Sequence, residues 1–161
     1  MKDLLNDPLP AASVRPILLV EDSLIDIDFM VQALLDNQVT HPLRVCRDGA
    51  EALAYVGRHG SPADPELPLL VLLDLNLPLV HGLEVLRQAR GHPVWRLVPV
   101  LMLSNACDAA DVTGAYALGA NGYVVKPLSY DAFAVTVGHI KNFWLGVNRL
   151  PLAPISSSFS P

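Results

Sequence analysis

The sequence predicts a single doubly wound α/β domain, with helices on both faces of a five-stranded parallel sheet. Short apolar runs alternate with amphipathic segments along most of the chain. Four of the five runs are continuously apolar, as expected for strands buried on both faces. The chain has 161 residues and 52% hydrophobic residues, which suits one domain with its own core.

The apolar runs give the strands in order, the second being the weakest. They are predicted at residues 17–20, 43–46, 69–73, 98–103 and 123–125.

The amphipathic segments between these runs supply the crossover helices. They are predicted at residues 23–37, 49–57, 82–90 and 109–118. A last helix starts near Ser129, a suitable N-cap, and carries Phe133, Val137, Ile140 and Trp144 on one face. Pro151 is expected to end it.

The two ends of the chain lack this periodicity. Residues 1–14 contain Pro8 and Pro10, and residues 151–161 include a Ser-rich stretch. We predict two flexible extensions around a compact domain at residues 15–150.

Composition excludes several classes of function. The net charge is −5 and Lys and Arg are not clustered, which argues against nucleic-acid binding. The N-terminus lacks the pattern of a signal peptide, and no apolar run reaches the length of a membrane span. Cys46 and Cys107 show no metal or disulfide spacing, so we expect buried thiols in a reducing cytoplasm. The five histidines are scattered without ligand spacing and are expected at the surface.

Polar residues stand where the predicted strands end. They are Glu21-Asp22, Asp74, Ser104 and Lys126. The carboxyl ends of parallel strands meet at one edge of the sheet, where open α/β folds bind ligands. Three carboxylates at one edge repel each other unless a cation holds them, and a hard divalent ion such as Mg²⁺ prefers such oxygen ligands. Lys126 and Ser104 would then face an anion at Asp74.

These residues lie within motifs that resemble the receiver domain of two-component response regulators. The motifs are Leu-Val-Glu-Asp at 19–22, Leu-Leu-Asp-Leu-Asn-Leu-Pro at 72–78, Leu-Ser-Asn-Ala at 103–106 and Gly-Ala-Asn-Gly-Tyr-Val-Val-Lys-Pro at 119–127. The resemblance covers about residues 16–150 and implies the flavodoxin-like strand order 2-1-3-4-5.

The resemblance assigns a role to each carboxylate. It makes Asp74 the phospho-acceptor, with Asp22 binding Mg²⁺ directly and Glu21 binding it through water. The backbone carbonyl of Asn76 would complete the metal site. A carboxylate is a poor nucleophile toward a phosphoryl group because two anions must approach, so positive charge is required. The implied protein is a signalling phospho-acceptor and not an enzyme with a separate substrate, apart from its own phosphorylation and slow autodephosphorylation.

The same resemblance assigns the response to phosphorylation. Ser104 is the switch hydroxyl, Tyr123 the switch aromatic and Lys126 the phosphate-binding lysine. The Lys126-Pro127 bond is often cis in this family. The chain departs from the common pattern in having Glu-Asp instead of Asp-Asp and Ser instead of Thr, and the family tolerates both changes. The long loop at residues 60–68 is expected to be a solvated connection.

Shorter similarities point to a subfamily and to partners. Residues 74–78, 117–121 and 140–144 resemble single-domain regulators paired with bacterial and cyanobacterial phytochromes, which implies a red-light-sensing histidine kinase as partner. Phe143-Trp144 is the most particular part, although packing of a terminal helix explains it equally well. The kinase is expected to dock near Ser23, Leu24 and Asp26.

Output is expected through a partner or through oligomerisation, because no effector sequence follows Pro151. We predict a homodimer through the fourth helix, fifth strand and fifth helix. Its outer face would include Val135 and Gly138, extended by Ala115, Tyr116 and Val147.

Three alternatives to a phosphorylated receiver differ from it in the residues that they require. A flavodoxin needs a hydroxyl- and glycine-rich loop after the first strand, but Glu21-Asp22-Ser23 would repel a flavin phosphate. A phosphatase of the haloacid-dehalogenase type needs a second Asp two residues after the nucleophile, and Asn76 stands there. A receiver-like module that binds partners without phosphorylation stays open as the alternative.

Overall fold

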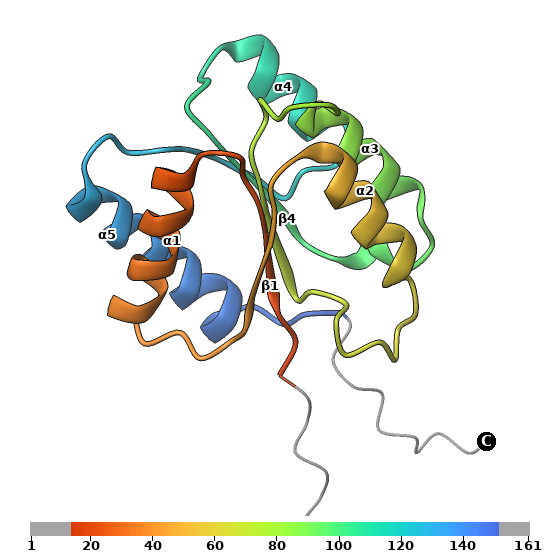
Figure 1. The fold of residues 1–161 in the computed structure, drawn as a ribbon, viewed down its shortest axis with the longest axis horizontal. Coiled ribbons are helices and arrows are strands. Elements are labelled where there is room, and N and C mark those ends of the chain that lie inside the picture. The colour runs from red at the N-terminus through yellow and green to blue at the C-terminus, as the bar shows by residue number, and fades with distance from the viewer. Residues whose placement is uncertain (1–13, 152–161) are drawn as a thin grey trace, which may run out of the picture.

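The fold is a parallel sheet of five strands in the order β2-β1-β3-β4-β5, with helices on both faces. The computed structural model describes residues 14–151. Helices α1 and α5 cover one face of the sheet, and α2, α3 and α4 cover the other (Figure 1). The predicted fold class and strand order are therefore confirmed. The extensions predicted at residues 1–14 and 151–161 lie almost entirely outside the described residues and stay predictions.

The strands follow the apolar runs closely. They are β1 (Ile17–Val20), β2 (Leu43–Cys46), β3 (Leu70–Leu73), β4 (Val100–Ser104) and β5 (Gly122–Val125). Every residue of the three central strands is buried, whereas the edge strands β2 and β5 are partly exposed. This difference explains why the β2 run is the weakest in the sequence.

The fourth strand begins two residues later than predicted. Residues Trp95–Leu97 form a short 3-10 helix, η1, and the ladder starts at Val100. Pro99 has no amide hydrogen to donate to the ladder, although its carbonyl still accepts a hydrogen bond from Val71 N at 2.9 Å.

The helices alternate with the strands as predicted. They are α1 (Leu24–Asp36), α2 (Gly49–Arg58), α3 (Gly82–Gly91), α4 (Ala109–Ala117) and α5 (Tyr130–Ile140). The side chains of Ser23, Asp48 and Ser129 each accept a backbone N–H from the first turn of the helix that follows. Each of these caps fixes the point at which the chain turns from strand to helix.

The end of the last helix differs from the prediction of one continuous α-helix. After Ile140 the chain continues as a π-helix, η2 (Lys141–Val147), and Asn148 N donates to Phe143 O at 2.7 Å. Trp144 packs against the core beneath α1 and α5, whereas Phe143 is half-exposed. The π-helix has a wider turn than an α-helix, and Trp144 lies on its core face. Trp144 therefore has a packing role.

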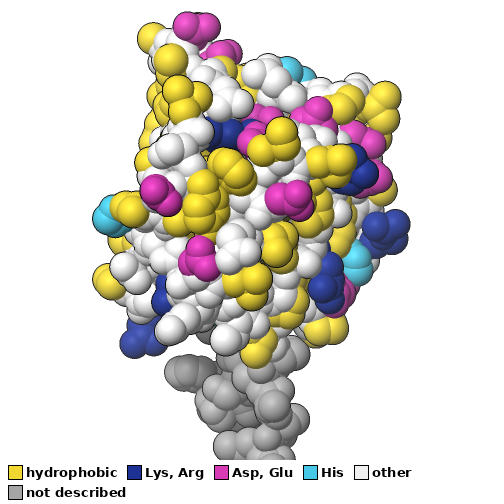
Figure 2. Space-filling model, turned by 60° about the vertical axis from the view of Figure 1, so that its left-hand side comes forward, with side chains coloured by type: hydrophobic (Ala, Val, Ile, Leu, Met, Phe, Trp, Pro, Cys, Tyr) yellow, Lys and Arg dark blue, Asp and Glu magenta, His cyan; other side chains and the backbone are white. Residues whose placement is uncertain are grey.

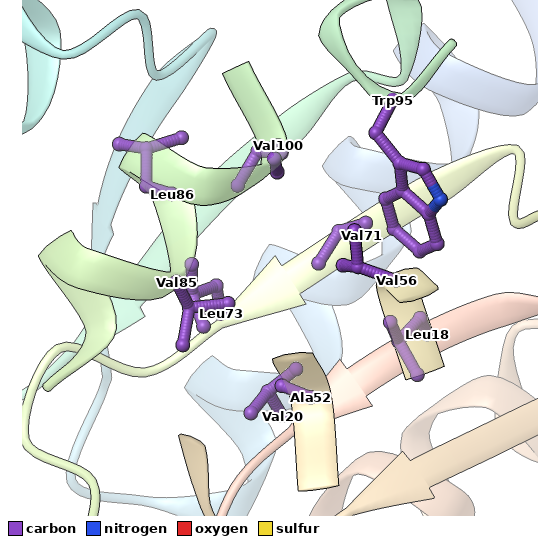
Figure 3. Close-up of a pocket in the computed structure, with 11 residues that line it drawn as sticks. Leu18, Val20, Ala52, Val56, Val71, Leu73, Val85, Leu86, Trp95 and Val100 are labelled. Carbon is purple, nitrogen blue, oxygen red and sulfur yellow. The ribbon is translucent and has the colours of Figure 1, made fainter. Parts of the chain in front are cut away.

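Two apolar clusters fill the space on either side of the sheet. In β1, Leu18 and Val20 face α2 and α3, whereas Ile17 and Leu19 face α1 and α5. Figure 3 shows the first cluster around a narrow apolar cavity, with side chains from β1, β3, β4, α2 and α3 converging beside Trp95. The indole N–H of Trp95 is satisfied by the His59 carbonyl at 2.8 Å.

Helices α1 and α5 are joined by polar contacts as well as by packing. The Tyr130 hydroxyl donates to the Asp36 carboxylate, and Asn37 Nδ2 donates to Ala134 O at 3.0 Å. A Cβ added to Gly138 would lie 2.7 Å from Asn37 Oδ1. Gly138 therefore faces the end of α1, and its predicted place on the outer face of the last helix is wrong because the Asn37 side chain packs against it.

The loop at residues 60–68 is held to the domain by charged and polar contacts. His59 Nδ1 lies 2.9 Å from Asp64 Oδ2, and Arg44 Nε lies 2.6 Å from Glu66 Oε2. The Tyr55 hydroxyl donates to Glu66 O at 2.6 Å. A backbone hydrogen bond lowers the pKa of Asp64, and the bond from Arg44 lowers the pKa of Glu66. The loop is exposed at many positions, as expected of a solvated connection, but it is anchored at both acids.

The two cysteines differ in environment. Cys46 is buried, and burial raises the pKa of its thiol to about 11. Cys107 is exposed, so the prediction of two buried thiols is wrong for this residue, which lies in the loop after β4. Among residues 14–151, no helix is both long and apolar enough to span a bilayer.

Replacing Tyr130 by Phe is expected to raise the pKa of Asp36, because the hydroxyl that stabilises its carboxylate is lost. Because the pKa of Asp36 is lowered in the folded wild type, the contact between Tyr130 and Asp36 stabilises the fold at neutral pH. This stabilisation is lost as the pH falls through the pKa of Asp36. The pKa of Tyr130 is raised to about 12, so the contribution also fades as the pH rises toward that value. Carboxyl ¹³C NMR titration measures the change.

Tyr116→Phe is the matched control, since Tyr116 is an exposed tyrosine on α4. It should leave the pKa of Asp36 unchanged. The same Asp36 pKa in wild type and Tyr130→Phe would contradict the contact.

Candidate functional site

The buried polar side chains of the described residues gather at the carboxyl edge of the sheet. They are Glu21, Asp74, Ser104 and Lys126. The register explains the gathering, since Val20 pairs with Leu73 and Ser104 pairs with Val125. The predicted meeting of these residues at one edge is therefore observed.

Lys126 is surrounded by three carboxylates. Its Nζ lies 2.5 Å from Glu21 Oε2, 2.9 Å from Asp26 Oδ2 and 3.4 Å from Asp74 Oδ2. Burial alone would lower the pKa of Lys126, but the bonds to Glu21 and Asp26 outweigh it and the pKa is raised. Burial raises the pKa of Glu21, and the bond from Lys126 opposes that shift. The site thus holds a protonated lysine.

Three acidic side chains form the one group within residues 14–151 that could share a metal ion. Carboxylate oxygens of Glu21, Asp22 and Asp74 lie within 4.8 Å of one another. Both oxygens of Glu21 already accept hydrogen bonds, Oε1 from Ser23 N at 3.0 Å and Oε2 from Lys126. Asp22 is exposed and Asp74 lies at the base of the site. An all-oxygen donor set of this kind suits Mg²⁺, with Asp22 and Asp74 better placed than Glu21 to be direct ligands.

The turn after β3 holds Asp74 in place. Leu75 N donates to Asp74 Oδ1 at 2.7 Å, and Gly82 N donates to Leu75 O at 2.8 Å. A Cβ on Gly82 would lie 2.2 Å from the Asp74 carbonyl oxygen, so only glycine allows α3 to start this close to the strand. Asn76 lies exposed in this turn.

Ser104 and Tyr123 meet at one residue of the loop between β4 and α4. Ala106 N donates to Ser104 Oγ at 3.1 Å, and the Tyr123 hydroxyl donates to Ala106 O at 2.8 Å. Ser104 is fully buried and Tyr123 half-buried, and burial raises the pKa of Tyr123. The two predicted switch residues are linked through the backbone of Ala106.

The Lys126-Pro127 bond is trans, as are the other peptide bonds of the described residues. The cis form expected from the family resemblance is therefore not observed here. Trans is the lower-energy isomer of an X-Pro bond in the absence of tertiary contacts that favour cis.

Asp26 is a site residue that the sequence did not identify, since it was predicted only as part of the kinase-docking surface. It lies in the first turn of α1, and its carboxylate reaches Lys126. Asp22 precedes the helix, so no helical spacing in the sequence points to Asp26. The histidines take no part in the acidic group: His81 and His139 are exposed as predicted, whereas His41, His59 and His92 are half-buried.

The sequence that carries this site matches a known protein family. A family model for the response regulator receiver domain matches residues 17–137, most of the chain. The chain belongs to the response regulator receiver family. This receiver is 39% identical over 146 residues to the probable methanogenesis regulatory protein FilR2 of Methanothrix harundinacea, covering 91% of the chain and 94% of that protein.

Other response regulators are similar over nearly their whole length. Response regulator Rcp1 of Synechocystis is 35% identical over 153 residues, covering 95% of the receiver and all of Rcp1. The crystal structure of the phosphorylated cyanobacterial phytochrome response regulator RcpA superposes with a TM-score of 0.78 at 37% identity, covering 85% of the receiver and 97% of RcpA. A structure described as the Mn²⁺-bound form of Rcp1 has a TM-score of 0.75 at 36% identity, covering 84% of the receiver and 97% of that chain.

Gly82→Ala is expected to lower the free energy of unfolding by about 1–3 kcal/mol, because the added methyl group meets backbone atoms of Asp74 and Leu75 that cannot move aside cheaply. Urea denaturation measures the change. Gly57→Ala in α2 is the matched control, since its methyl group meets nothing within 4 Å. It should raise the same free energy by about 0.5–1 kcal/mol. Wild-type stability of Gly82→Ala would contradict the close approach.

Proposed function

We propose that this receiver accepts a phosphoryl group on Asp74 from a histidine kinase and converts it into a change of protein-binding surface. The observation that supports this most is the combination around Asp74: a largely buried carboxylate, a neighbouring acidic pair and a lysine Nζ at 3.4 Å. A carboxylate in such a place can act as nucleophile if positive charge offsets the approach of a second anion.

The chain supplies part of that charge and a site for the rest. Asp22 and Asp74 would hold Mg²⁺ directly, Glu21 would hold it through water, and the carbonyl of Asn76 would add a further oxygen. Bound Mg²⁺ would offset negative charge on the transferring phosphoryl oxygens. Lys126 is protonated and adjacent, so it can donate to one of these oxygens. An oxygen of Asp74 bonds to phosphorus as the bond from phosphorus to the leaving group breaks.

The response would begin at Ser104 and Tyr123. An acyl phosphate adds negative charge at Asp74, which attracts the Ser104 hydroxyl as a donor. Ser104 Oγ now accepts from Ala106 N, and Tyr123 holds the carbonyl of the same residue. A turn of Ser104 toward the phosphoryl group would therefore disturb the loop that anchors Tyr123.

The proposed kinase partner is a phytochrome. The support is the similarity to RcpA, which is described as a cyanobacterial phytochrome response regulator, and the apolar start of α1, where Leu24 and Ile25 are exposed. A kinase domain docking there would bring its phosphohistidine to the Asp74 edge. As a phospho-acceptor, the protein would be a signalling protein and not an enzyme with a separate substrate.

Acetyl phosphate with Mg²⁺ is expected to phosphorylate the wild-type protein and leave Asp74→Asn unlabelled, because the amide is not a nucleophile. Intact-mass spectrometry detects the added group, and fragmentation after reduction of the acyl phosphate locates it. Asp28→Asn, which removes an exposed acid on α1, should label normally. Equal labelling of Asp74→Asn and wild type would reject the phospho-acceptor role and favour the phosphorylation-independent binding module.

We also propose a homodimer through α4, β5 and α5. Tyr116, Val125 and Val135 are 53%, 47% and 61% exposed on these elements. Ala115 is fully buried and is removed from the predicted face, because it packs into the core beside α3. Val147 in η2 is 78% exposed and remains on it. Figure 2 shows exposed hydrophobic side chains interspersed with acidic groups on the α1 and α5 side.

Val135→Asp is expected to shift the mass from dimer to monomer, since a charge would be buried at the contact. Light scattering at micromolar concentration, with and without phosphorylation, measures it. Val31→Asp, an exposed valine on α1, should not change the mass. A monomeric wild type in both states would reject the dimer.

A further inference from the structure

The Lys126 ammonium group has one carboxylate partner, Asp26, that lies outside the acidic group formed by Glu21, Asp22 and Asp74. Asp26 Oδ2 lies 2.9 Å from Lys126 Nζ, closer than the 3.4 Å between Nζ and Asp74 Oδ2. The other two acidic partners follow strands, whereas Asp26 lies on the first turn of α1. The lysine is thus tied to a helix as well as to the sheet edge.

This contact is more than a surface ion pair. The Lys126 side chain is 4% exposed and the Asp26 side chain 28% exposed. The backbone of Asp26 is fixed, because its N–H donates to the Ser23 cap at 3.3 Å. An ammonium group has three donors, and Glu21, Asp26 and Asp74 take one each.

We propose that Asp26 is a positioning residue, which holds the ammonium group of Lys126 on the α1 side of the site and so sets how strongly the lysine engages Glu21 and Asp74. This inference rests on the proposed function of the same site. Asp26 would share the lysine charge, and Asp74 would remain more available to a metal ion and to a phosphoryl group.

The consequence follows from competition for the same oxygens. Glu21 and Asp74 belong both to the lysine cluster and to the acidic group with Asp22. If Asp26 loses its charge, the ammonium group pairs more strongly with Glu21 and Asp74. The negative potential that attracts a divalent cation then falls at the carboxylates that would bind it.

The test compares two amides on the same helix. Asp26→Asn should raise the Mg²⁺ dissociation constant by about three- to tenfold in isothermal titration, as expected for the loss of a partly exposed charged hydrogen bond. Asp28→Asn removes the same charge from an exposed position and should change the constant by less than about twofold because of screening. Asp26→Glu keeps a carboxylate and should stay near wild type.

A second measurement follows the lysine itself, without metal or phosphate. The chain has three lysines, Lys2, Lys126 and Lys141, so the ¹⁵N ammonium signal of Lys126 can be assigned. Asp26→Asn should shift this signal and speed its hydrogen exchange, and Asp28→Asn should do neither. In a Lys126→Met background, Asp26→Asn and Asp28→Asn should change Mg²⁺ affinity equally.

Three outcomes would overturn the inference. They are equal Mg²⁺ constants for Asp26→Asn and Asp28→Asn, tighter binding by Asp26→Asn, and an unchanged Lys126 signal in Asp26→Asn. None of them depends on phosphorylation. Failure of the phospho-acceptor role would appear as labelling of Asp74→Asn, so the two failures are distinguishable.

Discussion

The site depends on one buried cation that is shared among carboxylates from separate parts of the chain. Lys126 follows β5, Glu21 follows β1 and Asp74 follows β3. The lysine can pair with both carboxylates only when these strand ends lie together. A buried charge left without its partner is costly, by about 3–5 kcal/mol in typical proteins. The fold therefore brings the acids together, and the lysine makes their proximity tolerable.

The polar groups of the site lie at the carboxyl edge of the sheet, whereas the central strands below this edge are buried in apolar surroundings. The central strands are buried at every position, and their side chains alternate between two apolar layers. The buried polar side chains of the described residues stand at or just after the ends of the strands. Gly82 lets α3 begin against the Asp74 backbone, and the Ser23 cap starts α1 beside Glu21. The residues that pack the core thus lie along the strands, and the residues of the candidate site lie at the strand ends.

The sequence predicted what depends on periodicity and chain order. Uniform apolar runs located the central strands, and parallel strands forced Glu21, Asp74, Ser104 and Lys126 to one edge. The features that the sequence did not predict depend on contacts between elements that are distant in sequence. Gly138 faces Asn37, a relation that no local pattern contains. The π-helix after Ile140 holds Trp144 against a core built from distant elements, and Asp26 pairs with Lys126, which lies 100 residues later in the sequence.

Ser104 and Tyr123 both form hydrogen bonds with main-chain atoms of Ala106. Its N–H donates to Ser104 and its C=O accepts from Tyr123, so neither bond uses the Ala106 side chain, which packs against the apolar cluster under α2 and α3. Proline at this position would remove the bond to Ser104, because it has no N–H to give. Two related proteins could therefore share this connection and differ at residue 106, and a comparison of side chains alone would overlook it.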